Sequence, residues 1–271
     1  NAPLAGMLFV LEEMQRDFSP AVFTAGFLAC IAGNIVTHLL VGTASAFHVP
    51  LVHAPDVAAL PWFIVLGICA GLLGVVFNRG LIATLDFSAH FSRWPFGLLA
   101  ALGGFLVGAL AFWHPDWVGS GHSLAESALS GKLLLSALPL LFLVRLVLTH
   151  GSYGTGVPGG IFAPLLCIGA LIGLAVGLVG HALFPALDPR VFAAVGMAAY
   201  FTAIVRAPLT GIVLIAEMTG DYSLLLPLFV ASFAAYGVAE LLRNPPLYET
   251  LLERSLVPGD RDFDSQAAKA S

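Results

Sequence analysis

One phrase occurs twice in this chain, about two hundred residues apart. Ala2–Gly6 reads APLAG and leads through an apolar stretch to Glu12, and Ala207–Gly211 reads APLTG and leads through another to Glu217. Each glutamate stands ten residues after the alanine that opens its phrase. Duplication of this kind is typical of transporters whose two repeats enclose a site near the middle of the bilayer. Because the first copy stands at the start of the chain, which has no initiator methionine, we expect the first repeat to be represented here only by its tail.

The composition is that of a membrane protein. Hydrophobic residues make up 59% of the chain and charged residues 10%, and the mean hydropathy is +0.95. Soluble domains hold about 25% charged residues. The net charge of -5 is small and dispersed, which argues against a nucleic-acid partner. Cys30, Cys69 and Cys167 lie far apart in apolar stretches, the histidines have no metal-ligand spacing, and no nucleophile motif is present. We therefore expect no cofactor, no metal and no enzyme.

Several of the apolar segments are short or broken by glycine and proline. We expect membrane helices at 3–14, 20–45, 61–86, 96–113, 132–150, 160–183, 191–204, 207–219 and 222–243. A helix that crosses a bilayer needs about 20 apolar residues, and helices that end inside the membrane need protein or a cavity to satisfy their ends. This pattern favours a transporter or channel core. The basic residues of the polar tail after Tyr248 place the C-terminus in the cytoplasm, and we expect this tail to be frayed.

The segment Gly154–Pro164 has the composition of an anion site. It reads GTGVPGGIFAP, an irregular glycine-rich loop followed by an apolar helix that opens at about Gly160. Pro164 falls in the first turn, where its missing N–H costs little. The free amides of Ile161 and Phe162 then point out of a helix end that carries partial positive charge, which suits an anion. The alternative is a glycine-rich packing loop between helices.

The order of the motifs resembles the CLC family of chloride channels and proton-coupled chloride exchangers. GSG at 119–121, GGIFAP at 159–164 and RAPLTG followed by an EMT triplet at 206–219 stand in the family's order. The opening NAPLAG with Glu12-Glu13-Met14 fits a further family segment, and Pro246-Leu247-Tyr248 fits the stretch that carries its pore tyrosine. The resemblance covers nearly the whole chain.

This resemblance implies roles for five residues. The amides of Ile161 and Phe162 would hold the central anion, and the Tyr248 hydroxyl would donate to it from the intracellular side. Glu13 would be the internal glutamate that relays protons, and Glu12 a neighbouring acid at the proton entrance. For Tyr248 the alternative is an interfacial aromatic anchor. For Glu12 it is a solvated carboxylate that faces Arg16 one turn on.

Glu217, the counterpart of Glu12, is expected to be structural, and Arg145, a lone cation in an apolar run, to have a buried partner. Ser120 matches the second repeat's counterpart of the family's pore serine, and we give it no role because the family does not use that position as a ligand.

The implied fold is an all-α integral membrane protein of the CLC type, with inverted repeats and short, broken and tilted helices. Residues 1–46 would end the first repeat, 47–255 would form the second repeat as the membrane transport domain, and 256–271 a short polar tail. The family's GSGxP and GxEGP motifs, with the pore serine and the gating glutamate, are absent. We expect both before Asn1, and we expect residues 1–271 alone to give no chloride flux.

Three functions are compared. The first is proton–chloride antiport, which Glu13 and Tyr248 favour, because channels of the family commonly hold an apolar residue at the position of Glu13. The second is passive chloride conduction through the same fold. The third is an intramembrane enzyme, which lacks a nucleophile–base pair. The resemblance also implies chloride and protons as the transported species, a homodimer, and a multi-pass location in the inner (plasma) membrane.

Overall fold

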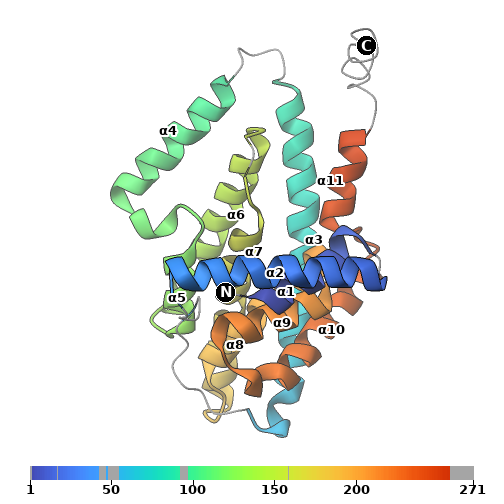
Figure 1. Cartoon of the computed structure of the whole chain (residues 1–271). Coiled ribbons are helices and arrows are strands. Elements are labelled where there is room, and N and C mark those ends of the chain that lie inside the picture. The colour runs from blue at the N-terminus through green and yellow to red at the C-terminus, as the bar shows by residue number, and fades with distance from the viewer. Residues whose placement is uncertain are drawn as a thin grey trace.

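The computed structural model describes residues 2–16, 18–42, 47, 55–91, 97–157 and 159–256, and all the regular structure in these ranges is helical (Figure 1). The all-α fold expected from the sequence is confirmed. The elements are α1 (Pro3–Phe9), η1 (Val10–Met14), α2 (Pro20–Leu40), η2 (Val57–Ala59), α3 (Leu60–Ala89), α4 (Leu98–Trp113), η3 (Pro115–Trp117), α5 (His122–Leu129), α6 (Leu138–Gly154), α7 (Phe162–Leu183), α8 (Pro189–Val205), α9 (Pro208–Thr219), η4 (Tyr222–Leu224), α10 (Leu225–Leu241) and α11 (Leu247–Leu256).

Proline marks the start of six of the described α-helices. It stands in the first two positions of α1, α2, α3, α6, α8 and α9. The first amides of a helix have no partner inside it, so proline loses nothing there and brings a backbone angle that already suits the helix. The apolar runs could therefore be divided correctly at prolines, including Pro3 and Pro208 in the two copies of the repeated phrase.

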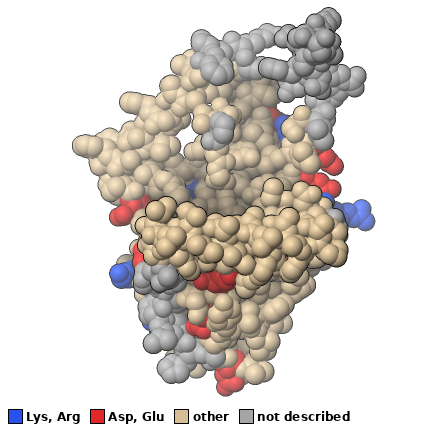
Figure 2. Space-filling view, in the orientation of Figure 1, with Lys and Arg blue, Asp and Glu red and all other residues tan. Residues whose placement is uncertain are grey.

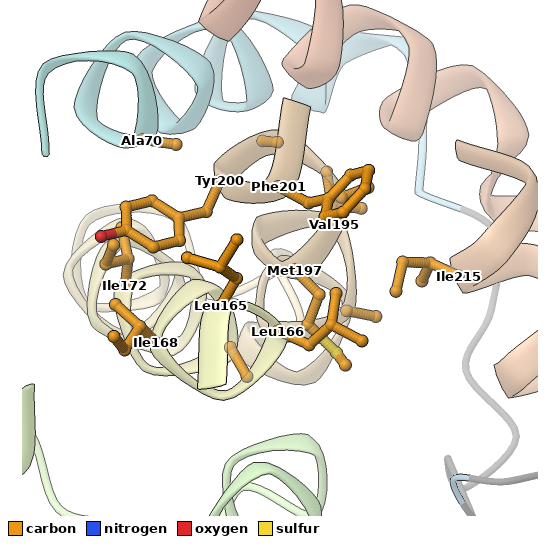
Figure 3. Packing of buried hydrophobic residues seen from close by; sticks show 14 of the residues in the cluster. Ala70, Leu165, Leu166, Ile168, Ile172, Val195, Met197, Tyr200, Phe201 and Ile215 are labelled. Carbon is orange, nitrogen blue, oxygen red and sulfur yellow. The ribbon is translucent and has the colours of Figure 1, made fainter. Parts of the chain in front are cut away.

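The core is built around α8, in which every residue from Val191 to Val205 is buried. A helix that is apolar on all sides is covered on all sides. α7, α3, α10 and α9 pack against it. Figure 3 shows leucine and isoleucine side chains of α7 interleaved with Val195, Met197, Tyr200 and Phe201 of α8. This centre holds the N-terminal end of α7 in place.

Glycines let α7 and α8 approach closely. Gly169, Gly173 and Gly177 recur every fourth residue on one side of α7 and face α8. A Cβ atom added at Gly169 would lie 2.6 Å from the carbonyl oxygen of Gly196, and one added at Gly177 would lie 2.8 Å from Cα of Pro189. Small residues at such spacing bring helix backbones together in membrane proteins.

Four of the described helical stretches are long and apolar enough to cross a membrane: Pro20–Leu40, Val57–Ala89, Phe162–Leu183 and Tyr222–Leu241. Shorter apolar helices accompany them, as the broken hydropathy pattern predicted. α2 has no buried residue and lies across the face shown in Figure 1, and Figure 2 shows that the surface there is almost entirely neutral. An exposed apolar helix of this kind suits lipid or a second protein surface.

The sequence analysis missed two of the described α-helices, and it placed the start of α6 several residues too early. α5 follows the GSG loop, and α11 covers residues that we expected to be a frayed tail. α6 begins at Leu138 and not at 132, because residues 135–137 form a turn. α11 is short and carries many polar residues, so no apolar run marked it. Residues 43–46, 48–54 and 257–271, which include parts of an expected helix, a connector and the tail, lie outside the described residues.

Candidate functional site

The α7 N-terminus has the form that the GGIFAP motif predicted, with its start one to two residues later. Ile161 is the N-cap, its carbonyl accepts a hydrogen bond from the Leu165 amide at 3.2 Å, and Phe162 is the first helical residue. Among the described residues, no protein acceptor takes a hydrogen bond from the amides of Ile161 or Phe162. Two unpaired donors at the positive end of a 22-residue helix can bind an anion without a cationic side chain.

A cavity of about 730 Å³ lies beside this helix end. Gly159 to Pro164 form one wall, and Ser120, Arg145, Tyr153 and Thr155 are among the other lining residues. Arg145 is only 2% exposed, and its guanidinium donates to the carbonyls of Trp117 and Gly119 at 3.1 and 3.0 Å. The partner expected for this buried cation is therefore backbone oxygen, which ties α6 to the GSG loop.

Phe9 joins the α7 N-terminus to Tyr248. Its ring lies edge-on to Phe162, with centroids 6.3 Å apart, and edge-on to Tyr248, with centroids 6.0 Å apart. Phe162 in turn packs edge-on against Phe201 of α8 at 4.9 Å. The structure thus brings together the beginning, the middle and the end of the chain around Phe9. Among the described residues, no protein group is hydrogen-bonded to the Tyr248 hydroxyl.

Glu12 holds the start of α9. Its carboxylate accepts from the amides of Leu209 and Thr210 at 3.2 and 2.8 Å and from the Thr210 hydroxyl at 2.9 Å. A carboxylate at a helix N-terminus satisfies free donors and complements the helix dipole. Arg16 does not pair with Glu12. The alternative interpretation, in which the Glu12 carboxylate faces Arg16, is therefore wrong about the partner.

Glu13 points to a different neighbour. Its side chain is 6% exposed and lies 3.7 Å from the guanidinium of Arg16, which also binds Glu249 at 3.1 Å. Glu249 follows Tyr248 in the chain and is 41% exposed. The two adjacent acids lie in the π-helical turn η1, a form found often at functional sites. The Glu12 carboxylate is therefore hydrogen-bonded to α9, while the Glu13 carboxylate lies buried beside α11.

Comparison with known proteins adds to this geometry. Residues 1–240 match the family described as voltage gated chloride channel. The chain belongs to this family. It is 39% identical over 263 residues to the "H(+)/Cl(-) exchange transporter ClcA" of Vibrio cholerae, which covers 94% of this chain and 56% of the relative. It is also 39% identical over 279 residues to the transporter of the same name in Klebsiella pneumoniae, covering 100% of this chain and 58% of the relative.

Solved structures of the family share the fold. A slow cyanobacterial Cl-/H+ antiporter superposes with a TM-score of 0.88 at 36% identity, over 96% of this chain and 62% of that one. A eukaryotic CLC transporter superposes with a TM-score of 0.75 at 26% identity, over 92% of this chain and 42% of that one. The chain thus spans about half the length of the curated relatives it matches. The CLC resemblance inferred from the motifs is confirmed.

One residue of the site, Phe9, was not singled out from the sequence. Its position in the second copy of the phrase, counted from Ala207 as Phe9 is counted from Ala2, is Leu214. An aromatic side chain in one copy only was the available signal. The sequence alone could not show that this ring lies between Phe162 and Tyr248.

Proposed function

We propose that the protein containing this chain exchanges chloride for protons across a membrane. The observation that carries the proposal is the convergence of three elements at Phe9: the α7 N-terminus with its two unpaired amides, the Tyr248 ring, and the π-helical turn with the buried Glu13. Neutral donors suit a halide that must both bind and leave. A buried carboxylate suits a proton that crosses beside it.

In this proposal the anion binds at the amides of Ile161 and Phe162, and the Tyr248 hydroxyl donates to it from the α11 side. A phenolic O–H is a neutral donor on a stiff ring. Glu13 takes a proton from the aqueous side near Arg16 and passes it inward, and Glu12 contributes to the entrance. The names of the relatives, which are exchange transporters and antiporters, support the same activity. Chloride and protons are the substrates, in an inner-membrane protein that works as a homodimer.

The experiment uses the complete gene product that contains these 271 residues, purified and reconstituted in proteoliposomes. An outward chloride gradient is imposed with the membrane potential controlled, and a chloride electrode and a pH electrode record the outer solution. Exchange predicts that protons move uphill in the direction opposite to chloride. Chloride flux without proton movement would assign the protein to passive conduction through the same fold. An absence of chloride flux, with the protein shown to be folded by its melting profile, would contradict the proposal.

A further inference from the structure

The connection between α10 and α11 is attached to α8 and α3 through its carbonyl groups. The Asn244 amide still donates to the Ala239 carbonyl at 3.1 Å, but Pro245 and Pro246 have no N–H and can be fixed only at their oxygens and by packing. The Asn244 carbonyl accepts from Nη2 of Arg206 at 2.6 Å, and the Pro245 carbonyl accepts from Nδ2 of Asn78 at 3.3 Å. α11 begins two residues later, and its second residue is Tyr248.

The guanidinium of Arg206 makes several contacts inside the fold. It ends α8 in the left-handed conformation, with φ 71°, which side chains other than glycine rarely adopt. Its side chain is 7% exposed. Nη1 donates to the Tyr236 carbonyl at 3.2 Å and to the Glu240 carboxylate at 3.0 Å, and the guanidinium lies 5.2 Å from the Tyr236 ring centroid. One planar cation therefore joins the end of α8, the side of α10 and the start of the α11 connection.

Asn78 provides a second, independent attachment from α3. It is 4% exposed, and its amide also donates to the Ile204 carbonyl at 3.4 Å, two residues before Arg206. The other ion pairs of α11, Arg16 with Glu249 and Arg254 with Asp86, lie at the surface, where such pairs contribute little. The buried attachments among the described residues include Arg206, Asn78, the Asn244 amide, which donates to the Ala239 carbonyl, and the side chain of Leu247, which is 1% exposed.

We infer that Arg206, assisted by Asn78, is a positioning residue for the Tyr248 hydroxyl. The inference deepens the proposed function and rests on it. The arginine directly precedes the second copy of the repeated phrase, and it fixes the residue four positions before Tyr248. It contacts no substrate. Loss of the hydrogen bonds from its guanidinium would leave the α7 amides in place but let the start of α11 move. The Tyr248 hydroxyl would then no longer contact the anion.

The principal variant is Arg206→Lys, which keeps the charge but cannot place donors on Asn244 and α10 at the same time. The matched control is Glu240→Gln, since Glu240 is 70% exposed and its change leaves the bond from Arg206 to Asn244 intact. Asn78→Ala is a second variant, on another helix, for the case in which Arg206→Lys does not fold. All are made in the complete gene product, alone and combined with Tyr248→Phe.

Two measurements separate positioning from general loss of structure. Hydrogen exchange by mass spectrometry should show α11 amides exchanging about tenfold faster in Arg206→Lys, with α7 and α8 unchanged. Chloride titration by calorimetry should show affinity about fivefold weaker in Arg206→Lys, but no further loss when Tyr248 is already phenylalanine. Asn78→Ala should change both in the same direction by a smaller factor, and Glu240→Gln should change neither.

Unchanged exchange in α11 would overturn the inference. So would chloride affinity that falls equally with and without the Tyr248 hydroxyl, because the arginine would then act on the whole fold. If Tyr248→Phe alone leaves chloride affinity unchanged, the ligand role of Tyr248 under the proposed function is wrong. In that case the exchange of α11 alone decides whether Arg206 holds this helix.

Discussion

Glu12 and Glu217 form a reciprocal pair of helix caps, because Glu12 caps α9, which carries Glu217, and Glu217 caps α1, which leads into the π-helical turn that carries Glu12. Glu217, near the end of α9, accepts from the amides of Leu4 and Ala5 at 3.1 and 2.8 Å. Glu12, after α1, accepts from the amides of Leu209 and Thr210 at 3.2 and 2.8 Å. The two caps have nearly the same geometry. The repeated phrase is therefore a structural unit in which each copy caps the helix of the other copy.

This reciprocal capping explains why each glutamate stands ten residues after its alanine. That distance is the length of α1 with its π-helical turn, or of α9 up to its last turn, and it places the carboxylate opposite the N-terminus of the antiparallel partner. Glu217 is therefore structural, as expected. Glu12 has the same structural role, because its carboxylate accepts three hydrogen bonds at the start of α9.

Glu217→Gln should destabilise the protein by about 1–2 kcal/mol, because one carboxylate oxygen becomes an amide nitrogen that faces another N–H donor. The measurement is thermal unfolding of the complete gene product in detergent. Glu253→Gln on the exposed side of α11 is the control, with no change expected. Equal melting temperatures for Glu217→Gln and Glu253→Gln would show that the cap does not contribute to stability.

Glu13→Gln should abolish proton movement driven by chloride while chloride still moves. Glutamine keeps the shape of the side chain and its hydrogen-bonding reach, but it cannot carry a proton. Glu12→Gln should reduce proton movement less and should lower the melting temperature, because Glu12 is a cap. Parallel recordings of pH and chloride in proteoliposomes check both. Undiminished proton movement in Glu13→Gln would remove this residue from the proton path.

Prolines and the apolar runs made most helix starts predictable, and GGIFAP located the α7 N-terminus within two residues. Arg145 was expected to have a buried partner, but the partner is backbone carbonyl oxygen, which leaves no trace in the sequence. α11 was missed for a related reason. It is a short polar helix attached through carbonyls by Arg206 and Asn78, and neither attachment follows from hydropathy or spacing.

The two adjacent glutamates show where sequence reasoning ends. Counted from each alanine, Glu12 matches Glu217 and Glu13 matches Met218, so the symmetric acid could be separated from the unsymmetric one. The direction in which each carboxylate points depends on the π-helical turn, which adds a residue to the helical hydrogen-bonded ring and has no recognisable sequence signal. The sequence therefore indicated that the pair differs, and the fold decides that Glu12 contacts α9 while Glu13 lies beside Arg16.

Tyr248→Phe should weaken chloride binding several-fold and loosen the coupling of protons to chloride, while the melting temperature changes little, because only one hydroxyl is lost. Chloride titration by calorimetry measures the first effect. Tyr222→Phe, at an exposed position in η4, is the control.

In crystals grown with bromide, anomalous density is expected within hydrogen-bond distance of the Ile161 and Phe162 amides. Density elsewhere, with those amides bonded to protein, would rule out this anion site.

Asp188 should make stability depend on pH in acid. It caps α8 through the Arg190 amide and pairs with the Arg190 guanidinium at 2.6 Å. Burial by itself would raise the pKa of Asp188, but the hydrogen bonds and charge of Arg190, with a smaller effect of His181, lower it below the ordinary 3.8. A lowered folded-state pKa gives stability that is complete above the ordinary value and is lost as pH falls through the folded value.

Melting temperatures at pH 7, 5, 4 and 3 check this effect. Asp188→Asn keeps a residue that caps helices well, so it should lower stability slightly at pH 7 and make the fall below about pH 4 less steep. Asp116→Asn, in the exposed η3 turn, is the control and should keep the wild-type slope. Parallel curves for Asp188→Asn and wild type would show that another group controls the acid transition.

Gly173→Ala should be the most damaging of these changes. The added methyl group would overlap the Phe192 carbonyl, and the neighbouring atoms are α8 backbone, which cannot turn aside as a side chain can. The two helices would have to separate where α8 is buried on all sides. We expect a loss of at least about 3 kcal/mol, which in practice means poor yield of folded protein.

The control is Gly108→Ala in α4, where an added methyl group meets no atom within 4 Å and alanine favours the helix. Yield and melting temperature of the two variants, measured side by side, give the comparison. A Gly173→Ala protein as stable as Gly108→Ala would mean that α7 and α8 do not cross as closely as described.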